Sequence, residues 1–176
     1  TGSRSVRLAA RYPEAHLPLV DASAEMIATT RERLAARFPA ARVDFITGFF
    51  EHLELPPATF DLVTSSISLH HVVAKAPLYA SIAAALAPGG TLRFSDQLRG
   101  SGRNHDHNWT RWLEHCREPG NCSPADIQSL LDHAAAHDHY TPLPEHLHLL
   151  AAAGLVELDC VWRNWIWGII TAEKPA

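Results

Sequence analysis

Gly2 and Asp21 are the two residues whose types and spacing best fit a chemical task. Gly2 precedes a predicted helix, and Asp21 ends the apolar run of residues 17–20. Glycine lets a backbone pass close to a ligand, and a carboxylate about 20 residues further on can accept hydrogen bonds from both hydroxyls of a ribose. The pair therefore predicts a nucleoside-binding site. The alternative is that Gly2 only starts a helix and Asp21 only caps a turn.

The histidine pair His70 and His71 is a second chemical signal, because it follows the strand-like run of residues 60–65. A neutral imidazole near pH 7 can take a proton from a hydroxyl or an amine. His71 is the candidate for this role, and we expect His70 to point elsewhere. A loop histidine that is hydrogen-bonded to the backbone is the alternative.

Aromatic and acidic residues further along the chain could complete an acceptor site. Trp109, Trp112 and Tyr140 could close over it and offer aromatic faces to a cation or a planar group, although packing within a lid would explain them as well. Asp96 is expected just beyond a strand, where it could contact the acceptor or cap a turn.

The remaining histidines, concentrated after residue 104, raise the question of a metal site. His133 and His137 have helical i, i+4 spacing, but the H-E-x-x-H pattern is absent and Cys116 and Cys122 lack zinc-finger spacing. Histidines in a polar segment are usually solvated. We therefore expect no metal.

The elements that must position these residues alternate between strands and helices, which predicts βαβ units and a parallel sheet. The chain should then end in an antiparallel hairpin with a tight turn at Arg163-Asn164. Predicted strands cover residues 17–20, 43–46, 60–65, 91–95, 155–161 and 165–171. Predicted helices cover residues 5–11, 23–37, 78–86 and 145–153, and a further helix begins at Ser123 and Pro124. Ser23 is expected to cap the second of these helices, and Pro88-Gly89-Gly90 is expected to end the third.

Several stretches in this order resemble class I S-adenosylmethionine-dependent methyltransferases. They are TGSRSVRLAARYP, LPLVDASAEM, SSISLHHV, ALAPGGTLRFSD and the terminal GLVELDCVWRNWIWGIITAEK. The resemblance implies an α/β, Rossmann-like methyltransferase sandwich with a mostly parallel sheet that ends in an antiparallel hairpin. We expect a single domain over residues 1–176, with residues 100–140 as a lid or insertion.

The same resemblance implies roles for individual residues, with S-adenosyl-L-methionine as the cofactor. The cofactor-binding residues would be Thr1, Gly2, Asp21, Ala22, Met26, Phe49, Phe50 and Ser66. The catalytic residues would be His71 and Tyr140. Phe49 stands where relatives usually have an Asp that holds the adenine, so Phe49 or Phe50 could stack on the base instead, or both could be core residues.

The glycine-rich loop of this family reads G-x-G-x-G, and Gly2 matches its last glycine. We therefore expect the fold to lack its first strand, which would lie at the centre of the sheet between the strands of residues 17–20 and 60–65. One alternative is accordingly a truncated or degenerate domain that has no activity. An NAD(P)-dependent Rossmann oxidoreductase is the other, because a glycine loop and a distant carboxylate serve both cofactors.

The composition of the chain restricts the kind of methyl acceptor and the cellular compartment that we expect. The net charge is −4, without a run of Lys or Arg, which favours a small-molecule acceptor over nucleic acid, although tRNA is not excluded. The chain has no apolar run long enough to span a membrane, no signal peptide pattern at its start and only three scattered cysteines. We therefore expect a cytoplasmic protein without a membrane partner. The oligomeric state is not indicated.

Overall fold

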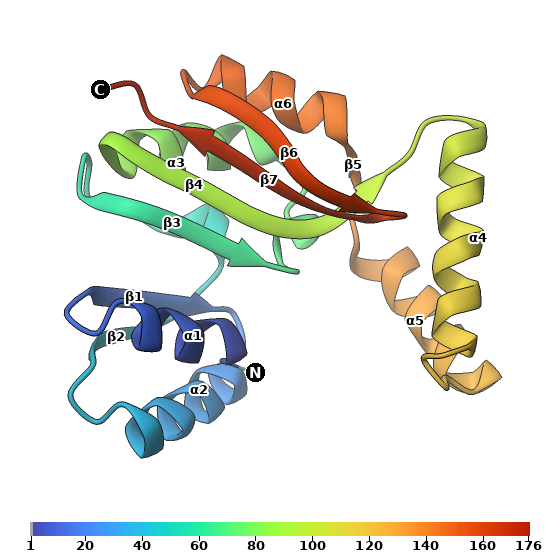
Figure 1. Ribbon diagram of the computed structural model, residues 1–176, viewed down its shortest axis with the longest axis horizontal. Helices are drawn as coiled ribbons and strands as arrows, with labels where there is room; N and C mark the ends of the chain where they lie inside the picture. Colours follow the sequence, from blue (N-terminus) through green and yellow to red (C-terminus); the bar gives the residue numbers. More distant parts are fainter. Residues whose placement is uncertain (1) are drawn as a thin grey trace. The chain divides into compact units, whose positions relative to one another are not determined.

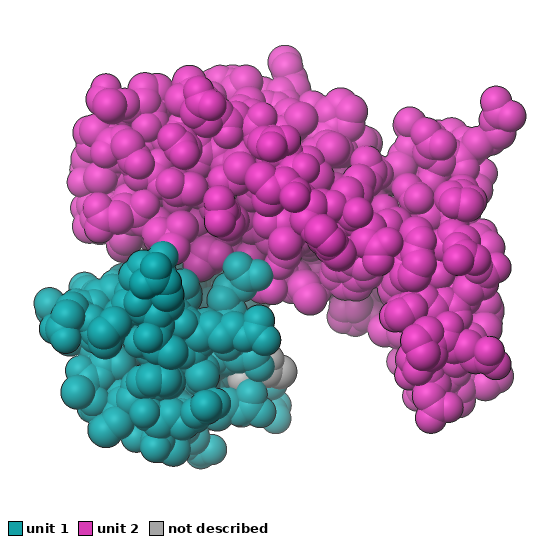
Figure 2. Space-filling view, viewed as in Figure 1, with its two compact units in different colours: residues 1–54 teal, residues 55–176 magenta. Residues whose placement is uncertain are grey.

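The computed structural model describes residues 2–176, so Thr1 and its predicted cofactor role lie outside the described residues. The chain divides into two compact units, residues 1–54 and residues 55–176 (Figure 2). Each unit has its own sheet, and the two are described separately below.

The first unit is built around two parallel strands with helices beside them (Figure 1). Its elements are α1 (Ser3–Arg11), β1 (His16–Asp21), α2 (Ala24–Arg37), β2 (Arg42–Thr47) and a 3₁₀ turn η1 (Phe50–His52). The register of β1 on β2 runs from His16 opposite Arg42 to Asp21 opposite Thr47. The predicted strands and helices of this half are therefore confirmed, each within a few residues.

Helix α2 starts where the sequence predicts. The hydroxyl oxygen of Ser23 accepts the N–H of Met26 at 3.2 Å, which satisfies one of the unpaired donors of the first helical turn. One face of the helix is buried and carries Ile27, Thr30 and Leu34. This spacing keeps apolar side chains on one side of the helix.

Gly2 is required by the packing of this unit, whatever ligand it binds. Its φ of +68° lies in the left-handed region, and a Cβ at this position would meet the Thr30 hydroxyl oxygen at 2.7 Å and the Thr30 Cα at 3.0 Å. Glycine therefore allows the start of α1 to approach α2 closely. The helix-start role of Gly2 is confirmed, while its predicted role beside a cofactor stays a prediction.

The second unit is a mixed sheet with strand order β3-β4-β7-β6, and β5 adds to β4 (Figure 1). Strands β3 and β4 are parallel, and β7 runs antiparallel to both β4 and β6. The elements are β3 (Phe60–Ser66), η2 (Leu69–His71), α3 (Lys75–Ala85), β4 (Leu86–Arg99), α4 (Arg103–Arg117), α5 (Pro124–His137), β5 (Thr141–Pro142), α6 (Leu143–Ala152), β6 (Val156–Asn164) and β7 (Trp167–Glu173). The predicted terminal hairpin is confirmed.

Strand β4 carries the core of this unit. Alternate side chains of β4, namely Leu92, Phe94, Asp96 and Leu98, are buried, and helices α3 and α6 pack together beside the sheet. The ring of Tyr79 on α3 stacks on Phe94 with centroids 6.1 Å apart. The carboxylate of Asp96 lies in the middle of this apolar row and therefore needs polar partners.

A buried hydrogen bond joins the two helices. The Tyr79 hydroxyl lies 2.7 Å from Nδ1 of His146 on α6. Burial, with the positive charge of Lys75, lowers the pKa of His146 to about 4, and burial raises the pKa of Tyr79 far above its usual value. Both groups are therefore neutral near pH 7, so the Tyr79 hydroxyl donates to the imidazole.

The helix before β4 ends at Ala85, within one residue of its predicted end, but both predicted bounds of the strand are wrong. The strand begins before Pro88-Gly89-Gly90, because Leu86 already pairs with Phe60 and is fully buried in the sheet. The strand continues to Arg99, so Asp96 lies inside β4 and does not follow it. Tertiary pairing here overrides the local turn signal.

The turn of the terminal hairpin is also displaced from its predicted place. Asn164 pairs with Trp167, so the two turn residues are Trp165 and Ile166, and the predicted Arg163-Asn164 still belongs to β6. Trp165 takes a φ of +51°, and the carbonyl of buried Ile166 accepts the N–H of Leu98. The burial of Ile166 therefore places the turn at two residues whose side-chain types alone would predict a strand.

The segment of residues 100–140 contains helices α4 and α5, which contact each other. The predicted start of α5 is confirmed: Ser123 and Asp126 form a reciprocal capping box, and Pro124 occupies the first turn. The role of this segment as a lid, like the single domain over residues 1–176, stays a prediction.

Within the described residues, β1 pairs only with β2, and β3 pairs only with β4. One edge of each of these two strands therefore has no strand partner in the part of the chain that the structure describes.

The depressed pKa of His146 predicts that acid destabilises the fold. An unfolded histidine takes up its proton near pH 6.5, whereas the buried one does so only at about 4, so stability falls as the pH drops through this interval. His146→Gln keeps an acceptor for Tyr79 but does not titrate, and it should show a smaller loss. Urea unfolding at pH 7 and pH 5 measures this, with the exposed neighbour substitution His148→Gln as control. Equal pH slopes for wild type and His146→Gln would refute the assignment.

Candidate functional site

In the first unit, Asp21 and Gly48 lie side by side at the carboxyl ends of β1 and β2. The backbone carbonyl of Asp21 accepts the N–H of Gly48 at 3.0 Å, and Phe49 follows directly. Ligands of parallel α/β sheets bind outside the carboxyl ends of the strands. The structure thus brings together Asp21 and Phe49, two of the residues that the sequence proposed for the nucleoside.

The carboxylate of Asp21 has a structural role that is compatible with a ligand. Its Oδ1 accepts the N–H of Ser23 at 2.9 Å, which shapes the turn into α2. A carboxylate has two oxygens and about four lone-pair positions, so this single bond leaves acceptor capacity. The turn role of Asp21 is therefore confirmed without excluding the ribose role.

The other predicted cofactor residues of this unit differ in exposure. The Phe49 side chain is 62% exposed, which rules out a core role and leaves its ring accessible to a planar ligand. Phe50 and Met26 are half-buried, and Ala22 is exposed. The sequence could not separate these cases, because a phenylalanine is equally compatible with core and stacking roles.

In the second unit, Ser66 is the last residue of β3, and its hydroxyl lies 3.1 Å from the hydroxyl of Ser95 on β4. Its backbone carbonyl accepts the hydroxyl of Ser68 at 3.0 Å. The carboxyl end of β3 is therefore linked to β4 by small polar side chains.

His70 points into the core, as the sequence predicts for the histidine that does not face an acceptor. Its Nδ1 lies 2.5 Å from Oδ1 of Asp96, and its backbone N–H donates to Oδ2 of Asp96 at 3.0 Å. The side chains of His70 and Asp96 are only 5% and 2% exposed. Asp96 thus fixes both the backbone and the ring of His70. It caps the turn η2 by accepting the N–H of His70, but it does so from within β4 and not from beyond the strand.

His71 is 46% exposed and lies beside a buried carboxylate. Its Nδ1 is 3.1 Å from Oδ1 of Asp138, whose side chain is only 5% exposed, and the same oxygen is 3.7 Å from Nε2 of His70. Tyr140 donates its hydroxyl to the other oxygen of Asp138 at 2.5 Å. Burial and this hydrogen bond raise the pKa of Tyr140 far above its usual value, so its hydroxyl stays protonated.

Backbone bonds hold the residues around Asp138 against η2. The N–H of His139 donates to the carbonyl of His70 at 2.7 Å. The buried ammonium of Lys75 donates to the carbonyls of Val72 at 2.7 Å and His139 at 2.8 Å. Burial lowers the pKa of Lys75, while the negative charges of Asp96 and Glu145 oppose the shift.

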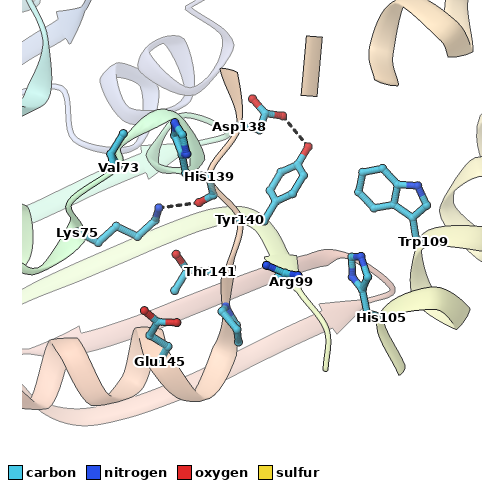
Figure 3. Close-up of a pocket in the computed structure, with 11 residues that line it drawn as sticks. Val73, Lys75, Arg99, His105, Trp109, Asp138, His139, Tyr140, Thr141 and Glu145 are labelled. Carbon is cyan, nitrogen blue, oxygen red and sulfur yellow. Dashed lines mark hydrogen bonds between the residues drawn. The ribbon is translucent and has the colours of Figure 1, made fainter. Parts of the chain in front are cut away.

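A cavity of about 590 Å³ lies next to this network (Figure 3). Cavities of this size accommodate small molecules. Its walls include charged side chains of both signs and two large aromatic rings: Lys75, Arg99, Asp138, Glu145, Trp109 and Tyr140. Trp109 and Tyr140 therefore lie where a closing segment would place them, whereas Trp112 is buried and packs on Trp109.

Sequence reasoning missed Asp138 and Lys75 and misplaced Asp96. Asp138 follows a helix in a polar segment, and Lys75 is the first residue of α3, so both are typical of solvated positions. No short-range spacing links residues 70, 96 and 138. The available signal was His70 itself, because a histidine beside an apolar run is buried only with a polar partner.

Comparison with known proteins identifies the family. Residues 1–90 match the family model of the methyltransferase domain. An uncharacterized methyltransferase of Mycobacterium bovis is 30% identical over 179 residues, which covers 99% of this chain and 83% of that protein. The ubiquinone/menaquinone biosynthesis C-methyltransferase UbiE of Methylobacterium nodulans is 37% identical over 91 residues, which covers 51% of this chain but only 36% of the relative.

Solved structures share the fold. Phosphoethanolamine N-methyltransferase 2 of Haemonchus contortus, in complex with S-adenosyl-L-methionine, superposes with a TM-score of 0.71 at 16% identity, over 99% of this chain and 46% of that one. An S-adenosylmethionine-dependent methyltransferase of Mesorhizobium loti gives 0.65 at 18% identity, over 97% and 85%. The fold is thus the Rossmann-like methyltransferase fold. The chain belongs to the methyltransferase domain family, in the class I S-adenosylmethionine-dependent group, and not to the nicotinamide oxidoreductases that its sequence left open.

Among the described residues, no helix is both long and apolar enough to cross a membrane. The cytoplasmic compartment stays a prediction.

The buried position of Lys75 predicts a local effect of its removal. Lys75→Met leaves the carbonyls of Val72 and His139 without their charged donor, and we expect a loss of about 1–3 kcal/mol in the free energy of unfolding. Hydrogen exchange should also quicken at the backbone amides of residues 70–72 and 139–141. Unchanged stability together with unchanged exchange in both segments would contradict the contacts described here.

Proposed function

We propose that this protein binds S-adenosyl-L-methionine with residues of its first unit and transfers the methyl group to a small polar molecule held by its second unit. The observation that carries the proposal is the Asp21 carboxylate at the carboxyl end of a parallel strand pair, in a chain of the methyltransferase domain family. Solved members of the same fold carry S-adenosyl-L-methionine or S-adenosylhomocysteine.

The residues of the first unit fit a nucleoside. Asp21 would accept hydrogen bonds from the ribose hydroxyls with the lone pairs that Ser23 leaves unused. The exposed ring of Phe49, next to Gly48 on the neighbouring strand, offers a stacking surface for the adenine in place of a carboxylate. Gly2, Ala22, Met26 and Phe50 would complete the cofactor surface of this unit, and the role of Ser66 at the methionine end of the cofactor stays a prediction.

The acceptor would occupy the cavity of the second unit. Lys75 and Arg99 present positive charge there, and Asp138 and Glu145 present negative charge, so a small polar molecule fits better than an apolar one. The overall charge of −4 further favours a small molecule over nucleic acid. The relatives do not identify this acceptor, because their names describe different ones, from a malonyl-acyl-carrier protein to phosphoethanolamine.

The transfer is a displacement in which a lone pair of the acceptor forms the new bond to carbon while the bond from the methyl carbon to sulfur breaks and its electrons remain on sulfur. His71 would take the proton that the acceptor loses. The carboxylate of Asp138, 3.1 Å from Nδ1, stabilises the imidazolium that this step creates. Tyr140, which lines the cavity and donates to Asp138, keeps that carboxylate in place.

Asp21→Ala should lower the affinity for S-adenosylhomocysteine by about 10-fold or more, because the charge-assisted hydrogen bonds to the ribose are lost. Asp21→Asn retains an oxygen for the N–H of Ser23, so it separates the loss of charge from damage to the turn. Isothermal titration calorimetry on the three proteins, with NAD as the negative control ligand, measures this. Affinity that is equal in wild type and Asp21→Ala would contradict the cofactor site.

His71→Ala should slow the formation of S-adenosylhomocysteine by about 100-fold or more at saturating acceptor, because general base catalysis contributes about that much. Cofactor affinity should not change. The acceptor would come from a screen of small hydroxyl and amine compounds, and His133→Ala is the matched control because its ring adjoins that of His71. A variant that turns over at the wild-type rate would return His71 to a structural role.

A further inference from the structure

The ring of His70 is held in one tautomer. Because Nδ1 of His70 lies 2.5 Å from a carboxylate oxygen of Asp96, we assign the proton to Nδ1. In the neutral imidazole, Nε2 then carries a free lone pair. This nitrogen is buried and faces Oδ1 of Asp138 at 3.7 Å.

Oδ1 of Asp138 has close neighbours but no hydrogen bond. It lies 3.1 Å from Nδ1 of His71 and 3.7 Å from Nε2 of His70, yet among the described residues it makes no hydrogen bond. The side chain is only 5% exposed. A buried carboxylate oxygen without a hydrogen bond is costly unless a cation or a donor compensates it.

The three atoms have the mutual spacing of ligands of one metal ion. Nε2 of His70, Nδ1 of His71 and Oδ1 of Asp138 all lie within 4.8 Å of one another. Tetrahedral Zn²⁺ with bonds of about 2.1 Å places its ligands about 3.4 Å apart. The 3.1 Å contact between Nδ1 of His71 and Oδ1 of Asp138 does not form a hydrogen bond, and the 3.7 Å contact from Nε2 of His70 is too long for one. Nδ1 of His71 also lies 3.5 Å from the carbonyl oxygen of His137, a long contact that an ion would have to displace.

The surroundings of these atoms resemble the outer sphere of a zinc site. Histidine ligands usually donate their second N–H to a carboxylate, as His70 does to Asp96. Carboxylate ligands are usually hydrogen-bonded in turn, as Asp138 is by Tyr140. The three ligands come from η2 and from the residue after α5, and the bond from His139 to His70 holds these segments together.

We propose that His70, His71 and Asp138 bind a divalent transition-metal ion of the Zn²⁺ type. Two imidazoles and one carboxylate suit Zn²⁺, Co²⁺ or Ni²⁺ better than Mg²⁺ or Ca²⁺, which prefer oxygen ligands. Three protein ligands leave a fourth tetrahedral position for water or another small ligand. Asp138 also lines the cavity, so the ion would lie beside a molecule bound there.

This inference goes beyond the proposed methyl transfer and can be tested separately from it, although the two proposals share His71. Coordination at Nδ1 of His71 keeps the remaining ring proton on Nε2, so a metal-bound His71 could not serve as a base. The two states of His71 therefore exclude each other in one molecule. Metal binding can be measured without cofactor or acceptor, and failure of either proposal leaves the other standing.

The test is titration of chelator-treated protein with Zn²⁺ in competition with a chromophoric chelator. We expect one ion per chain with a Kd of about 1 µM or lower, corresponding to a binding free energy of about 8 kcal/mol. His71→Ala removes a half-exposed ligand with little risk to the fold and should weaken binding by at least about 10-fold. Asp138→Asn should do the same, and Asp96→Asn should weaken binding without removing a ligand. Circular dichroism would establish that these two buried variants fold.

The matched control is the double variant His133→Ala, His137→Ala, which removes two neighbouring histidines on α5 and should keep the wild-type affinity. Replacement by Co²⁺ should give the visible absorption of a tetrahedral ion in wild type and a weaker band in His71→Ala. Wild-type protein that binds no stoichiometric Zn²⁺ would overturn the proposal. So would unchanged affinity in His71→Ala, or loss of binding in the double variant.

Discussion

The structure of the second unit depends on the groups that compensate the buried carboxylates of Asp138 and Asp96. Both carboxylates are almost fully buried, and both face the same imidazole, that of His70. Removing one partner from such a group leaves an uncompensated charge, which costs far more than a surface ion pair contributes. The residues come from positions 70, 96 and 138, so this polar cluster, together with the Lys75 bonds, links η2, β4 and the segment before β5.

The first unit is organised by short-range interactions instead. Ser23 caps α2, Asp21 shapes the turn before it, and the parallel register brings Gly48 beside Asp21. Each of these contacts joins residues that are close in sequence or lie on adjacent strands. The proposed nucleoside surface thus depends on backbone geometry, whereas the proposed acceptor surface depends on long-range side-chain interactions.

This difference explains how much could be predicted from the sequence. The strands and helices of the first unit, the Ser123 capping box and the terminal hairpin follow from local patterns of capping residues and apolar periodicity. The start of β4 and the Trp165-Ile166 turn do not, because burial of Leu86 and Ile166 against distant strands decides them. Asp138 was missed for the same reason: its burial and its neighbours arise only when the segment after α5 packs on η2.

The family match and the polar cluster around His70 cover different parts of the chain. The match to the methyltransferase domain covers residues 1–90, which include the predicted cofactor residues and both His70 and His71. Asp96, Asp138 and Tyr140, which set the environment of these histidines, lie beyond it. A relative that matches only the first half can share the two histidines and surround them with other groups. The chemistry at His71, whether proton transfer or metal coordination, must therefore be determined on this chain, because its controlling residues lie where that likeness ends.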